Sequence, residues 1–542
     1  MRVNCITSFS LFLHAPKAIA SEVDRLHPDR NMALKLLGQQ SLLSDAPRIF
    51  VVGLVLYAVG LVAYRLLFHP LRNIPGPWYA AATHWYEFYQ DVILDGHYIK
   101  DYPKLHAKYG PVVRVSPSRV HVYNPEYFKE VYGNGTKYTK DPDFFQSGGG
   151  IKYSIIMLID PEAHKQRRNT VKSIFSPKQM DQLAPVVLDV VKRAMARAQR
   201  SFEKGEAISM QPFWQAVTVD TIMPVLFDRN MNLVDQDEEF PPFLDIMEKF
   251  AENFLITKHF PFLIHLAMAI PMSIAQKLLP GYAQFRHQCS EWIQEIEDKQ
   301  KAGIDTASDG RSTYFDTLLS TKNTKMYHKL SREALVDEAL ALCFAGTDTT
   351  SFGLTFGTYY LLRHSDKLEK VLEELKTVGT NSEGLYEYRD ISSLPYLSAT
   401  IKEILRLSSP VPGIIPRRVP KGGATVDGYY LSEGTTVSQT LRTIHDNPDL
   451  FAEPEKFIPE RWLGEQGWAL EKYFVPFSKG PRSCLGMNVA YVEMYLSIAN
   501  FFSRFDMSLY KTDETTAVWI DSAAARIWKP IRVKIDSIKE YP

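Results

Sequence analysis

An uninterrupted apolar run near the N-terminus limits what this chain can fold into more than any other feature. Residues 49–64, "IFVVGLVLYAVGLVAY", carry no charge, and "RLLF" extends the run to residue 68. About 20 such residues form a helix that crosses the roughly 30 Å of a bilayer core. A buried core helix is the alternative, but the run is apolar on every side, and the prolines of "HPLRNIPGP" then stop the helix and stiffen the chain. We therefore predict a membrane anchor over residues 49–68 and a proline-rich hinge over 69–78.

The N-terminal extension, residues 1–48, is harder to interpret. "CITSFSLFLHAPKAIA" has some features of a secretory signal, but its apolar run is short and broken by polar residues. "MALKLLG" at Met32 is a plausible start of its own. We expect residues 1–31 to be dispensable. The charges around the anchor balance and leave its orientation open: Lys35 and Arg48 on one side, Arg65 and Arg72 on the other.

The composition is that of a globular protein with a large core. Hydrophobic residues make up 45% of the chain, and Lys plus Arg equals Asp plus Glu at 62 each, so no net charge favours binding to nucleic acid. The four cysteines are too few and too scattered for a disulfide framework or a structural zinc cluster; they are Cys5, Cys289, Cys343 and Cys484.

Residues 79–542 are predicted to form one large domain, because no repeat or long flexible linker divides them. The class is mainly α with minor β sheets. Apolar periodicity indicates helices in four long segments: Pro185–Glu203, Arg332–Arg363, Ser365–Thr377 and Leu394–Leu407. Strands are expected in two segments: "VVRVSPSRVHVY" (112–123) and "TVDGYYLSEGTTVS" (425–438).

Three charged residues form the first candidate cluster. Glu403 and Arg406 share one face of a helix at i,i+3 spacing. Arg461 of "FIPERW" could meet them and tie a long loop to that helix. The alternative is a set of unrelated surface charges.

The segment "AGTDTT", residues 345–350, interrupts a long helical pattern with a glycine and threonines. Gly346 is costly inside a helix, and threonine hydroxyls compete for the i−4 carbonyl and can bend the axis. A widened turn here would place Asp348 and Thr349 at a cavity as a proton relay. Close packing of a helix rich in small residues is the alternative.

"FSKGPRSCLG", residues 477–486, surrounds Cys484 with glycines and Arg482. The apolar segment that follows reads as a helix, whose N-terminal N–H groups would stabilise a thiolate. An inert buried cysteine is the alternative. It leaves the spacing of the glycines, the arginine and Phe477 unexplained.

These residues resemble the signature of the cytochrome P450 superfamily of haem-thiolate monooxygenases. Five fixed positions of its cysteine loop are matched, by Phe477, Gly480, Arg482, Cys484 and Gly486. The resemblance covers residues from about 70 onward, and "FHPLRNIPGP", "YGPVVRVSP" and "PERW" look like microsomal fungal members. It implies the cytochrome P450 fold, with an N-terminal transmembrane helix.

The resemblance also gives the candidate residues roles. Cys484 would be the axial ligand of the iron of haem b. The other cofactor-binding residues would be Phe477 and the propionate partners Arg482, Arg168, Arg417 and His164, where His164 stands at a position that is often Trp in the family. Asp348 and Thr349 would deliver protons. Glu403, Arg406 and Arg461 would hold the cysteine loop in place.

The acid Asp348 and the alcohol Thr349 favour oxygen activation over two alternative functions. A haem-thiolate isomerase or dehydratase acting on a peroxide needs no outside protons, and a non-catalytic haem-binding sensor needs no relay. The expected substrate is a neutral hydrophobic molecule, and the resemblance to fungal members suggests a terpenoid or polyketide of secondary metabolism. The segments matching the family's substrate-facing regions include the "SAAAR" run near Ala523, and their apolar residues are Phe144, Phe145, Ile155, Ile156, Phe344, Val411, Ile414 and Ile415.

The chain shows no glycine-rich nucleotide fingerprint after a strand, so we expect a separate electron donor. The resemblance implies NADPH–cytochrome P450 reductase, with cytochrome b5 as an optional partner. Lys165 and Lys172 are the expected docking residues on the haem's proximal side. The protein would be a single-pass protein of the endoplasmic reticulum membrane with a cytosolic catalytic domain, leaving the sequon at Asn134 unglycosylated. Residues 260–275 are expected either to dip into the membrane or to pack in the core.

Overall fold

The computed structural model describes residues 39–146, 149–303, 312–319, 330–522 and 524–540. The chain divides into two units, Met1–His69 and Pro70–Pro542. The predictions for residues 1–31 and for Ala523 lie outside the described residues.

The described residues of the first unit form one long helix, α2 (Gln39–Leu67). Its stretch Pro47–Leu67 has a mean hydropathy of 2.2 and no buried residue, and it is the one helix in the described part of the chain that is long and apolar enough to span a membrane. Phe50, Leu56 and Tyr57 are among its exposed apolar side chains. These properties fit the predicted anchor.

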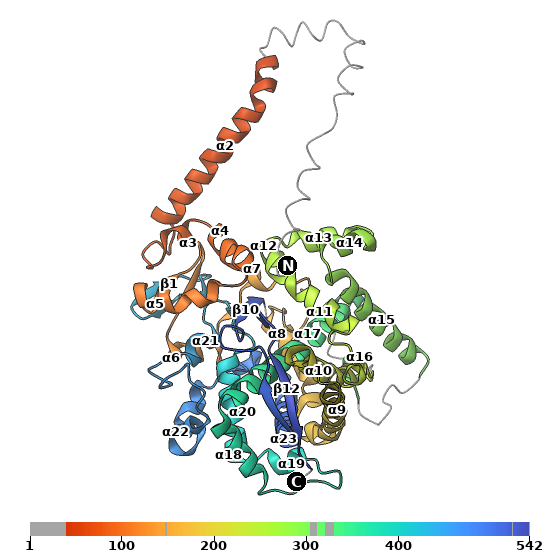
Figure 1. The fold of residues 1–542 in the computed structure, drawn as a ribbon. Coiled ribbons are helices and arrows are strands. Elements are labelled where there is room, and N and C mark those ends of the chain that lie inside the picture. Colours follow the sequence, from red (N-terminus) through yellow and green to blue (C-terminus); the bar gives the residue numbers. More distant parts are fainter. Residues whose placement is uncertain (1–38, 147–148, 304–311, 320–329, 523, 541–542) are drawn as a thin grey trace. The chain divides into compact units, whose positions relative to one another are not determined.

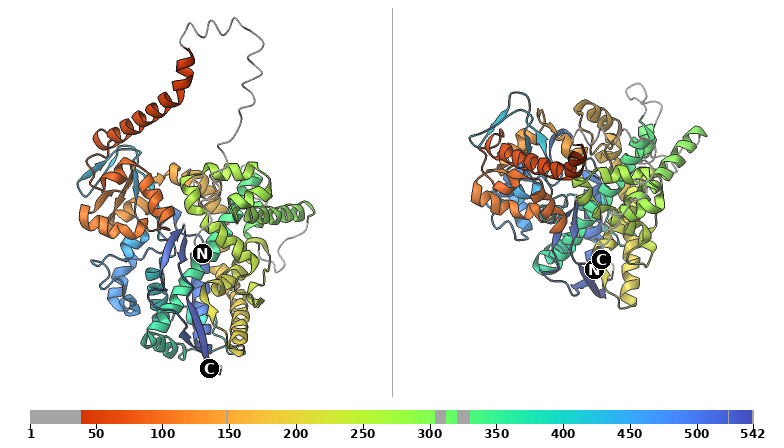
Figure 2. Two further views of the ribbon diagram at one scale, coloured as in Figure 1. Left: turned by 45° about the horizontal axis from the view of Figure 1, so that its top comes forward. Right: turned by 90° about the horizontal axis from the view of Figure 1, so that it is seen from above.

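The second unit is mainly helical (Figures 1 and 2). Its N-terminal half contains these α-helices: α3 (Trp78–Ala82), α4 (Trp85–Phe88), α5 (Tyr102–Tyr109), α6 (Pro125–Tyr132), α7 (Pro142–Phe145), α8 (Pro161–Val171), α9 (Pro177–Glu203), α10 (Met210–Phe227), α11 (Pro242–Glu252), α12 (Phe254–His259), α13 (Phe262–Ala269) and α14 (Met272–Leu278). The remaining α-helices are α15 (Tyr282–Lys301), α16 (Tyr314–Leu319), α17 (Arg332–Arg363), α18 (Ser365–Leu375), α19 (Tyr388–Ile391), α20 (Pro395–Ser408), α21 (Leu441–His445), α22 (Gly464–Leu470) and α23 (Met487–Arg504). Short 3-10 or π turns are η2 (Tyr89–Ile93), η3 (Tyr98–Asp101), η4 (Lys172–Phe175), η5 (Leu233–Asp235), η7 (Pro459–Trp462), η8 (Glu471–Tyr473) and η9 (Gly480–Arg482).

The strands form four small sheets. The largest has the order β1-β2-β8-β5-β3, in which only β2 and β8 are parallel. Its strands are β1 (Val112–Arg114), β2 (Arg119–Val122), β3 (Thr139–Lys140), β5 (Arg417–Arg418) and β8 (Thr436–Ser438). The others are β4-β12-β9 (Ile208–Ser209, Arg532–Ile538, Phe505–Leu509), β6-β7 (Ala424–Val426, Tyr429–Leu431) and β10-β11 (Trp519–Ser522, Ala524–Ile527).

Most expected elements are confirmed, with one boundary corrected. Helix α17 has the predicted bounds, and both predicted β segments contain strands, with Gly428 at φ +82° in the β6-β7 turn. Helix α9 begins at Pro177, eight residues before the predicted start at Pro185. Pro177 occupies the first turn, where a proline costs nothing. Pro185 lies inside the helix because the buried face continues past it, from Leu183 to Val187.

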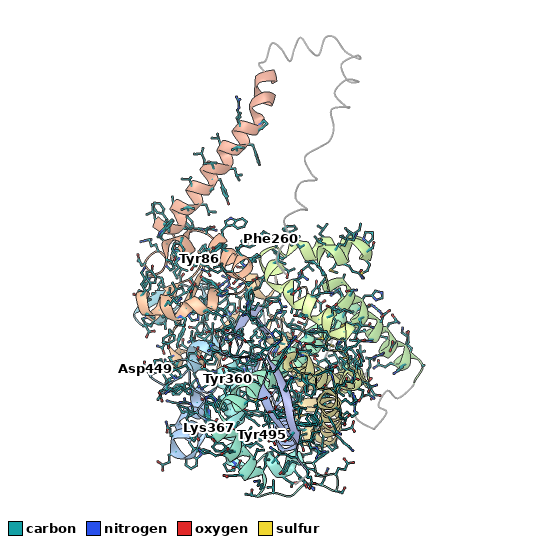
Figure 3. All side chains as sticks on the ribbon, viewed as in Figure 1. Tyr86, Phe260, Tyr360, Lys367, Asp449 and Tyr495 are labelled. Carbon is teal, nitrogen blue, oxygen red and sulfur yellow. The ribbon has the colours of Figure 1, made fainter. Side chains whose placement is uncertain are left out.

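Helix α17 runs through the main core and packs against α10, α15, α20 and α23. Figure 3 shows how densely side chains fill this region around Tyr360 and Tyr495. The Tyr360 ring stacks on Phe457 with centroids 5.3 Å apart, and the Tyr495 hydroxyl bonds to Ser398 Oγ at 2.6 Å. The core thereby fixes α17, which carries Asp348 and Thr349, and α23, which follows the segment that contains Cys484.

Candidate active site

The cysteine segment is held in a tight loop immediately before α23. The Cys484 N–H donates to the Phe477 carbonyl at 2.9 Å. Gly480 has φ +69°, and a Cβ there would lie 2.3 Å from the Tyr132 carbonyl oxygen, so only glycine fits. Gly486 differs, because its φ is −86° and no described atom lies within 4 Å of a Cβ. The chain itself gives no steric reason for the second glycine.

The electrostatics of Cys484 follow the sequence-based prediction only in part. The N–H groups of Gly486 and Met487, and the guanidinium of Arg168, lower the pKa of the thiol as expected for a helix N-terminus. Burial is the larger effect, and the pKa of Cys484 is raised overall. The Cys484 side chain has solvent-accessible surface and lines a cavity. Protein atoms nevertheless surround that cavity, so the thiol is poorly solvated. The chain alone therefore favours the neutral thiol, and a bound metal cation would be needed to reverse this.

Cys484 lines a mainly apolar cavity of about 320 Å³. Helix α17 contributes Ala345, Gly346 and Thr349 to its wall. Glu493 of α23 is the one carboxyl group among the lining residues, and burial raises its pKa well above the usual range, which favours its neutral form. No other carboxyl group of the described residues lines this cavity.

Four cationic side chains and one neutral histidine gather at or beside this cavity. They come from β3, α8, β5 and the cysteine loop: Lys140, His164, Arg168, Arg417 and Arg482. Burial, followed in most of them by repulsion from neighbouring cations, lowers the pKa of each; that of Arg482 falls to about 10 and that of His164 to about 3. None forms an ion pair with a carboxylate of the described residues.

The hydrogen bonds of these cations go to neutral acceptors. Arg482 donates to the Leu158 and Ile159 carbonyls at 2.6 and 2.9 Å, and Arg168 donates to the Ser483 carbonyl at 2.8 Å. Buried charges without counter-charges are costly. The cluster therefore suits an anionic group, and the carboxylates of a haem placed against Cys484 meet that requirement.

Lys140 is a further residue of this cluster that the sequence alone does not indicate. It lies in a two-residue strand directly opposite Arg417 in the β3–β5 pair, and its ammonium group donates to the Ile156 carbonyl. A lone lysine is usually solvated, so nothing in the local sequence signals its burial.

Asp348 and Thr349 lie on different sides of α17. Thr349 lines the cavity, and its Oγ1 donates to the Ala345 carbonyl at 2.8 Å, the predicted i−4 bond. Asp348 is buried outside the cavity lining and accepts a bond from Gln215 Nε2 of α10 at 2.8 Å. Helix α17 is unbroken here. A Cβ at Gly346 would lie 2.7 Å from Ile222 Cγ1, so close packing, the alternative given above, explains this glycine.

The charge cluster around Glu403 is formed as predicted. Arg406 binds the Glu403 carboxylate through Nε and Nη2 at 2.9 and 2.8 Å, and Arg461 Nε binds it at 3.0 Å. All three side chains are buried, which excludes the surface-charge alternative.

His445 connects this cluster to the cysteine loop. Its carbonyl accepts a bond from Arg406 at 2.9 Å, and its Nε2 accepts one from the Val475 N–H at 3.1 Å. Burial holds the pKa of His445 well below its usual value, so the ring stays neutral and can accept. Nothing in the local sequence marks this histidine, because the link exists only through the fold.

The expected substrate-facing residues divide into two groups. Ile155, Ile156, Val411 and Ile415 line the cavity. The others lie outside its lining: Phe144, Phe145, Phe344 and Ile414. Phe145, for instance, packs under the cations Lys140 and Arg417, 4.4 and 5.7 Å from its ring centroid.

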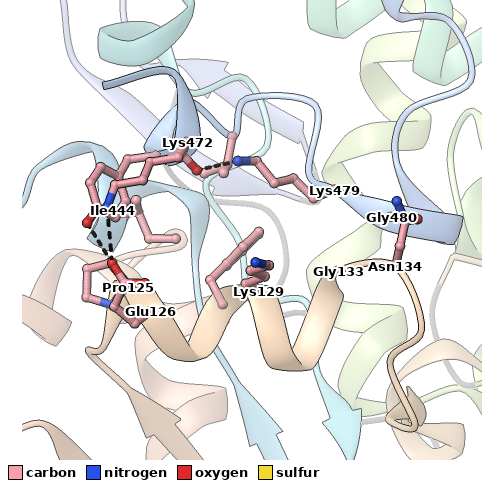
Figure 4. A pocket seen from close by; sticks show the side chains of 12 residues that line it. Pro125, Glu126, Lys129, Gly133, Asn134, Ile444, Lys472, Lys479 and Gly480 are labelled. Carbon is pink, nitrogen blue, oxygen red and sulfur yellow. Dashed lines mark hydrogen bonds and ion pairs between the residues drawn. The ribbon is translucent and has the colours of Figure 1, made fainter. Parts of the chain in front are cut away.

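A larger hollow, about 620 Å³, lies between α6 and the segment from Lys472 to Gly480 (Figure 4). Lys129, Lys472 and Lys479 flank it, and the Lys479 ammonium group donates to the Lys472 carbonyl. Neither Cys484 nor Thr349 is among its lining residues, so it is separate from the cavity of the candidate site.

A sequence model of the cytochrome P450 family matches residues 77–535. The chain belongs to the cytochrome P450 family. The P450 monooxygenase BOT1 of Botryotinia fuckeliana is 48% identical over 491 residues, which cover 90% of this chain and 96% of that protein. The P450 monooxygenases aneF of Aspergillus aculeatus (36% over 489 residues; 90% and 98% covered) and ankB of Aspergillus thermomutatus (37% over 510 residues; 93% and 96% covered) are also similar.

This P450 is therefore a haem-dependent monooxygenase, an oxidoreductase. The family binds haem-thiolate iron and generally works with redox partners and hydrophobic substrates.

Proposed function

We propose that this protein inserts oxygen from O2 into a neutral hydrophobic small molecule at a haem b whose iron is bound by Cys484. The observation that carries the proposal is that Cys484, Thr349, the buried Lys140 and the half-buried Arg168 and Arg482 line one mainly apolar cavity. The isomerase, dehydratase and sensor alternatives have no use for a hydroxyl relay beside the thiol, so Thr349 favours oxygen activation.

The haem, when bound, supplies the iron that activates oxygen, and thiolate donation favours cleavage of the O–O bond. The chain's part is to hold the Cys484 sulfur at the N-terminus of α23, where the N–H groups of Gly486 and Met487 face it. The buried cluster of Glu403, Arg406 and Arg461 fixes the position of this loop through His445.

The cation cluster would bind the two propionates. Arg168, Arg417 and Arg482 are the candidates implied by the family, and Lys140 is added by the structure. His164 is neutral at pH 7, because its pKa is about 3, and it can donate one hydrogen bond. Charge-assisted bonds to carboxylates would replace the present bonds to carbonyl oxygens.

Thr349 and Asp348 would move protons to the reaction chamber. Thr349 has its hydroxyl at the cavity wall, and Asp348 is a buried acid one residue earlier, with a pKa raised by burial to about 6. An acid with such a pKa can both hold and release a proton near neutral pH.

The substrate class follows from the cavity wall. Ile155, Ile156, Val411 and Ile415 are apolar, and burial favours the neutral form of Glu493, the one acid among the described lining residues. A terpenoid or polyketide intermediate of fungal secondary metabolism suits such a wall.

The proposed electron donor is NADPH–cytochrome P450 reductase, with cytochrome b5 as an optional second donor. The Lys165 side chain on α8 is 69% exposed, and Lys172, the first residue after the end of α8, is also exposed. Arg167 is excluded from docking because it is buried and paired with Glu338 at 3.1 Å.

We place the protein in the endoplasmic reticulum membrane, with α2 as a single-pass anchor, the catalytic domain in the cytosol and Asn134 unmodified. An apolar surface supports membrane contact: α3, α4, η2, α13 and α14 expose Trp78, Trp85, Tyr89, Ile93, Phe262, Leu266, Met268, Met272 and Ile274. Figures 1 and 3 show α4 and α13 at the same end of the second unit, and Phe260 packs on Phe88 with ring centroids 5.4 Å apart. Helix α13 also buries Ile264 and Ala267, so it serves both the core and the surface.

Metabolite profiling of a deletion strain tests the proposal, followed by feeding the accumulated precursor to microsomes that contain the protein. NADPH with reductase should support oxidation of the precursor. The proposal would be contradicted if the protein isomerised a peroxide substrate without NADPH, or if it converted none of the accumulated compounds.

A further inference from the structure

Asp348 is held by a residue of α10 that lies outside the proposed relay. Gln215, on the neighbouring helix α10, donates from Nε2 to Asp348 Oδ1 at 2.8 Å. Both side chains are only 7% exposed. No other side chain of the described residues donates a hydrogen bond to the Asp348 carboxylate, so the Gln215 amide determines which way this carboxylate points.

The charged groups near Asp348 form ion pairs with each other or with other residues, and not with Asp348. Arg526 of β11 is the cation that acts on it, but its guanidinium is paired with Glu248 and Glu252 of α11 at 3.2 and 3.1 Å. Glu248 also faces Asp348 and disfavours its ionised form. The described structure thus contains no ion pair between Asp348 and a cation.

An amide partner has a different chemical effect from a cationic one. A neighbouring cation commonly lowers a carboxyl pKa by roughly 1–3 units and keeps the acid ionised at pH 7. A neutral amide donates a hydrogen bond to the ionised form without adding a charge, so burial prevails and the pKa of Asp348 lies at about 6. An acid that exchanges protons at neutral pH needs this balance.

We infer that Gln215 is a positioning residue that holds the Asp348 carboxyl on the α10 side of α17 and sets its proton affinity. Its relevance to turnover rests on the proposed relay through Asp348 and Thr349. The bond also opposes any rotation of the carboxyl toward the cavity that Thr349 lines, so Gln215 controls both the proton affinity and the orientation of the acid.

The test is a titration of the Asp348 carboxyl in the full-length haem-loaded protein, read by infrared difference spectroscopy. The protonated carboxyl band of Asp348 is assigned by its loss in Asp348→Asn. In Gln215→Leu the midpoint should rise by about one pH unit, because a hydrogen bond to the ionised form is lost. In Gln215→Arg it should fall by about one unit or more.

Gln211→Leu is the matched control. Gln211 is another amide of α10 that reaches α17, where it bonds to Ser351 and Thr355 at 3.4 and 3.2 Å. Its replacement should leave the Asp348 midpoint unchanged. If Gln215→Arg does not fold, Gln215→Leu alone decides. An Asp348 midpoint that stays at the parent value in Gln215→Leu, or moves equally in Gln211→Leu, overturns the inference.

A second readout separates this inference from the proposed function. The pH dependence of peroxide released per NADPH oxidised should shift in the same direction as the Asp348 midpoint. If the midpoint moves and the peroxide profile does not, the positioning role of Gln215 stands and the relay through Asp348 fails. If the midpoint does not move, the positioning role fails whatever the peroxide profile does.

Discussion

Lys140 and Arg417 lie directly opposite each other in the β3–β5 pair, and neither is paired with a carboxylate of the described residues. Two buried like charges destabilise the chain until an anion joins them. Lys140→Met should therefore raise the stability of the haem-free protein by on the order of 1 kcal/mol and speed haem release about tenfold.

Haem transfer to a scavenging globin and denaturant unfolding of the haem-free form measure these two effects. Lys137→Met is the control, since Lys137 is exposed three residues earlier in the chain. Unchanged haem release in Lys140→Met would remove Lys140 from the proposed propionate site.

Gly346 packs so closely on α10 that a methyl group does not fit. The Cβ of Gly346→Ala would lie 2.7 Å from Ile222 Cγ1. We therefore expect the free energy of unfolding to fall by roughly 1–3 kcal/mol. In an Ile222→Ala background, the additional loss caused by Gly346→Ala should be much smaller than in the parent.

The control for the Gly346 and Ile222 variants is Gly353, which lies on the same helix, α17. A Cβ at Gly353 would meet only Met494 Cε, at 3.8 Å. Gly353→Ala should therefore be neutral, or stabilise by up to about 1 kcal/mol through helix propensity. Equal losses at the two glycines, measured by thermal unfolding, would argue against the packing explanation.

Asp348 makes stability depend on pH in a defined direction. Burial raises its folded-state pKa from 3.8 to about 6, so ionising it costs free energy of folding. The cost is absent below the unfolded pKa, grows as pH rises between the two values, and is complete above about pH 6. Asp348→Asn should gain on the order of 2–3 kcal/mol at pH 7.5 and little at pH 4.5. Unfolding curves at both pH values measure it, and a gain that is larger at pH 4.5 would contradict the assignment.

The proposed reductase contact predicts a salt-dependent defect. Charge reversal at Lys165 and Lys172 should slow reductase-supported turnover about tenfold at low ionic strength and less as salt screens the charges. Peroxide-driven turnover should be unaffected. Reversal of Lys376, exposed just after α18, is the control. Equal loss in both assays would mean that the fold or the haem is damaged.

The parts of the site that could be predicted from sequence are those encoded locally. The cysteine loop needs glycine at Gly480 for a backbone contact with Tyr132, and that requirement is visible as a fixed spacing around Cys484. The i−4 bond of Thr349 likewise follows from residue type and helix position alone.

Three other residues could not be found in this way, because their roles depend on neighbours far away in the chain. Lys140 becomes a site residue through strand pairing with Arg417, His445 through its bond to Val475, and Gln215 through its bond to Asp348. The early start of α9 was missed for a related reason, since packing of its buried face overrides the break expected at Pro185.

The whole proposed site depends on binding of the haem iron by the Cys484 thiolate, and the spectrum of the reduced carbon monoxide complex reports on this ligand. The parent protein should show the long-wavelength Soret band that marks thiolate ligation. Cys484→Ser should lose this band, whereas replacement of the buried Cys343, Cys343→Ser, should keep it in whatever protein folds. A Cys484→Ser protein that retains the long-wavelength band would contradict the assignment of this ligand and the active site built around it.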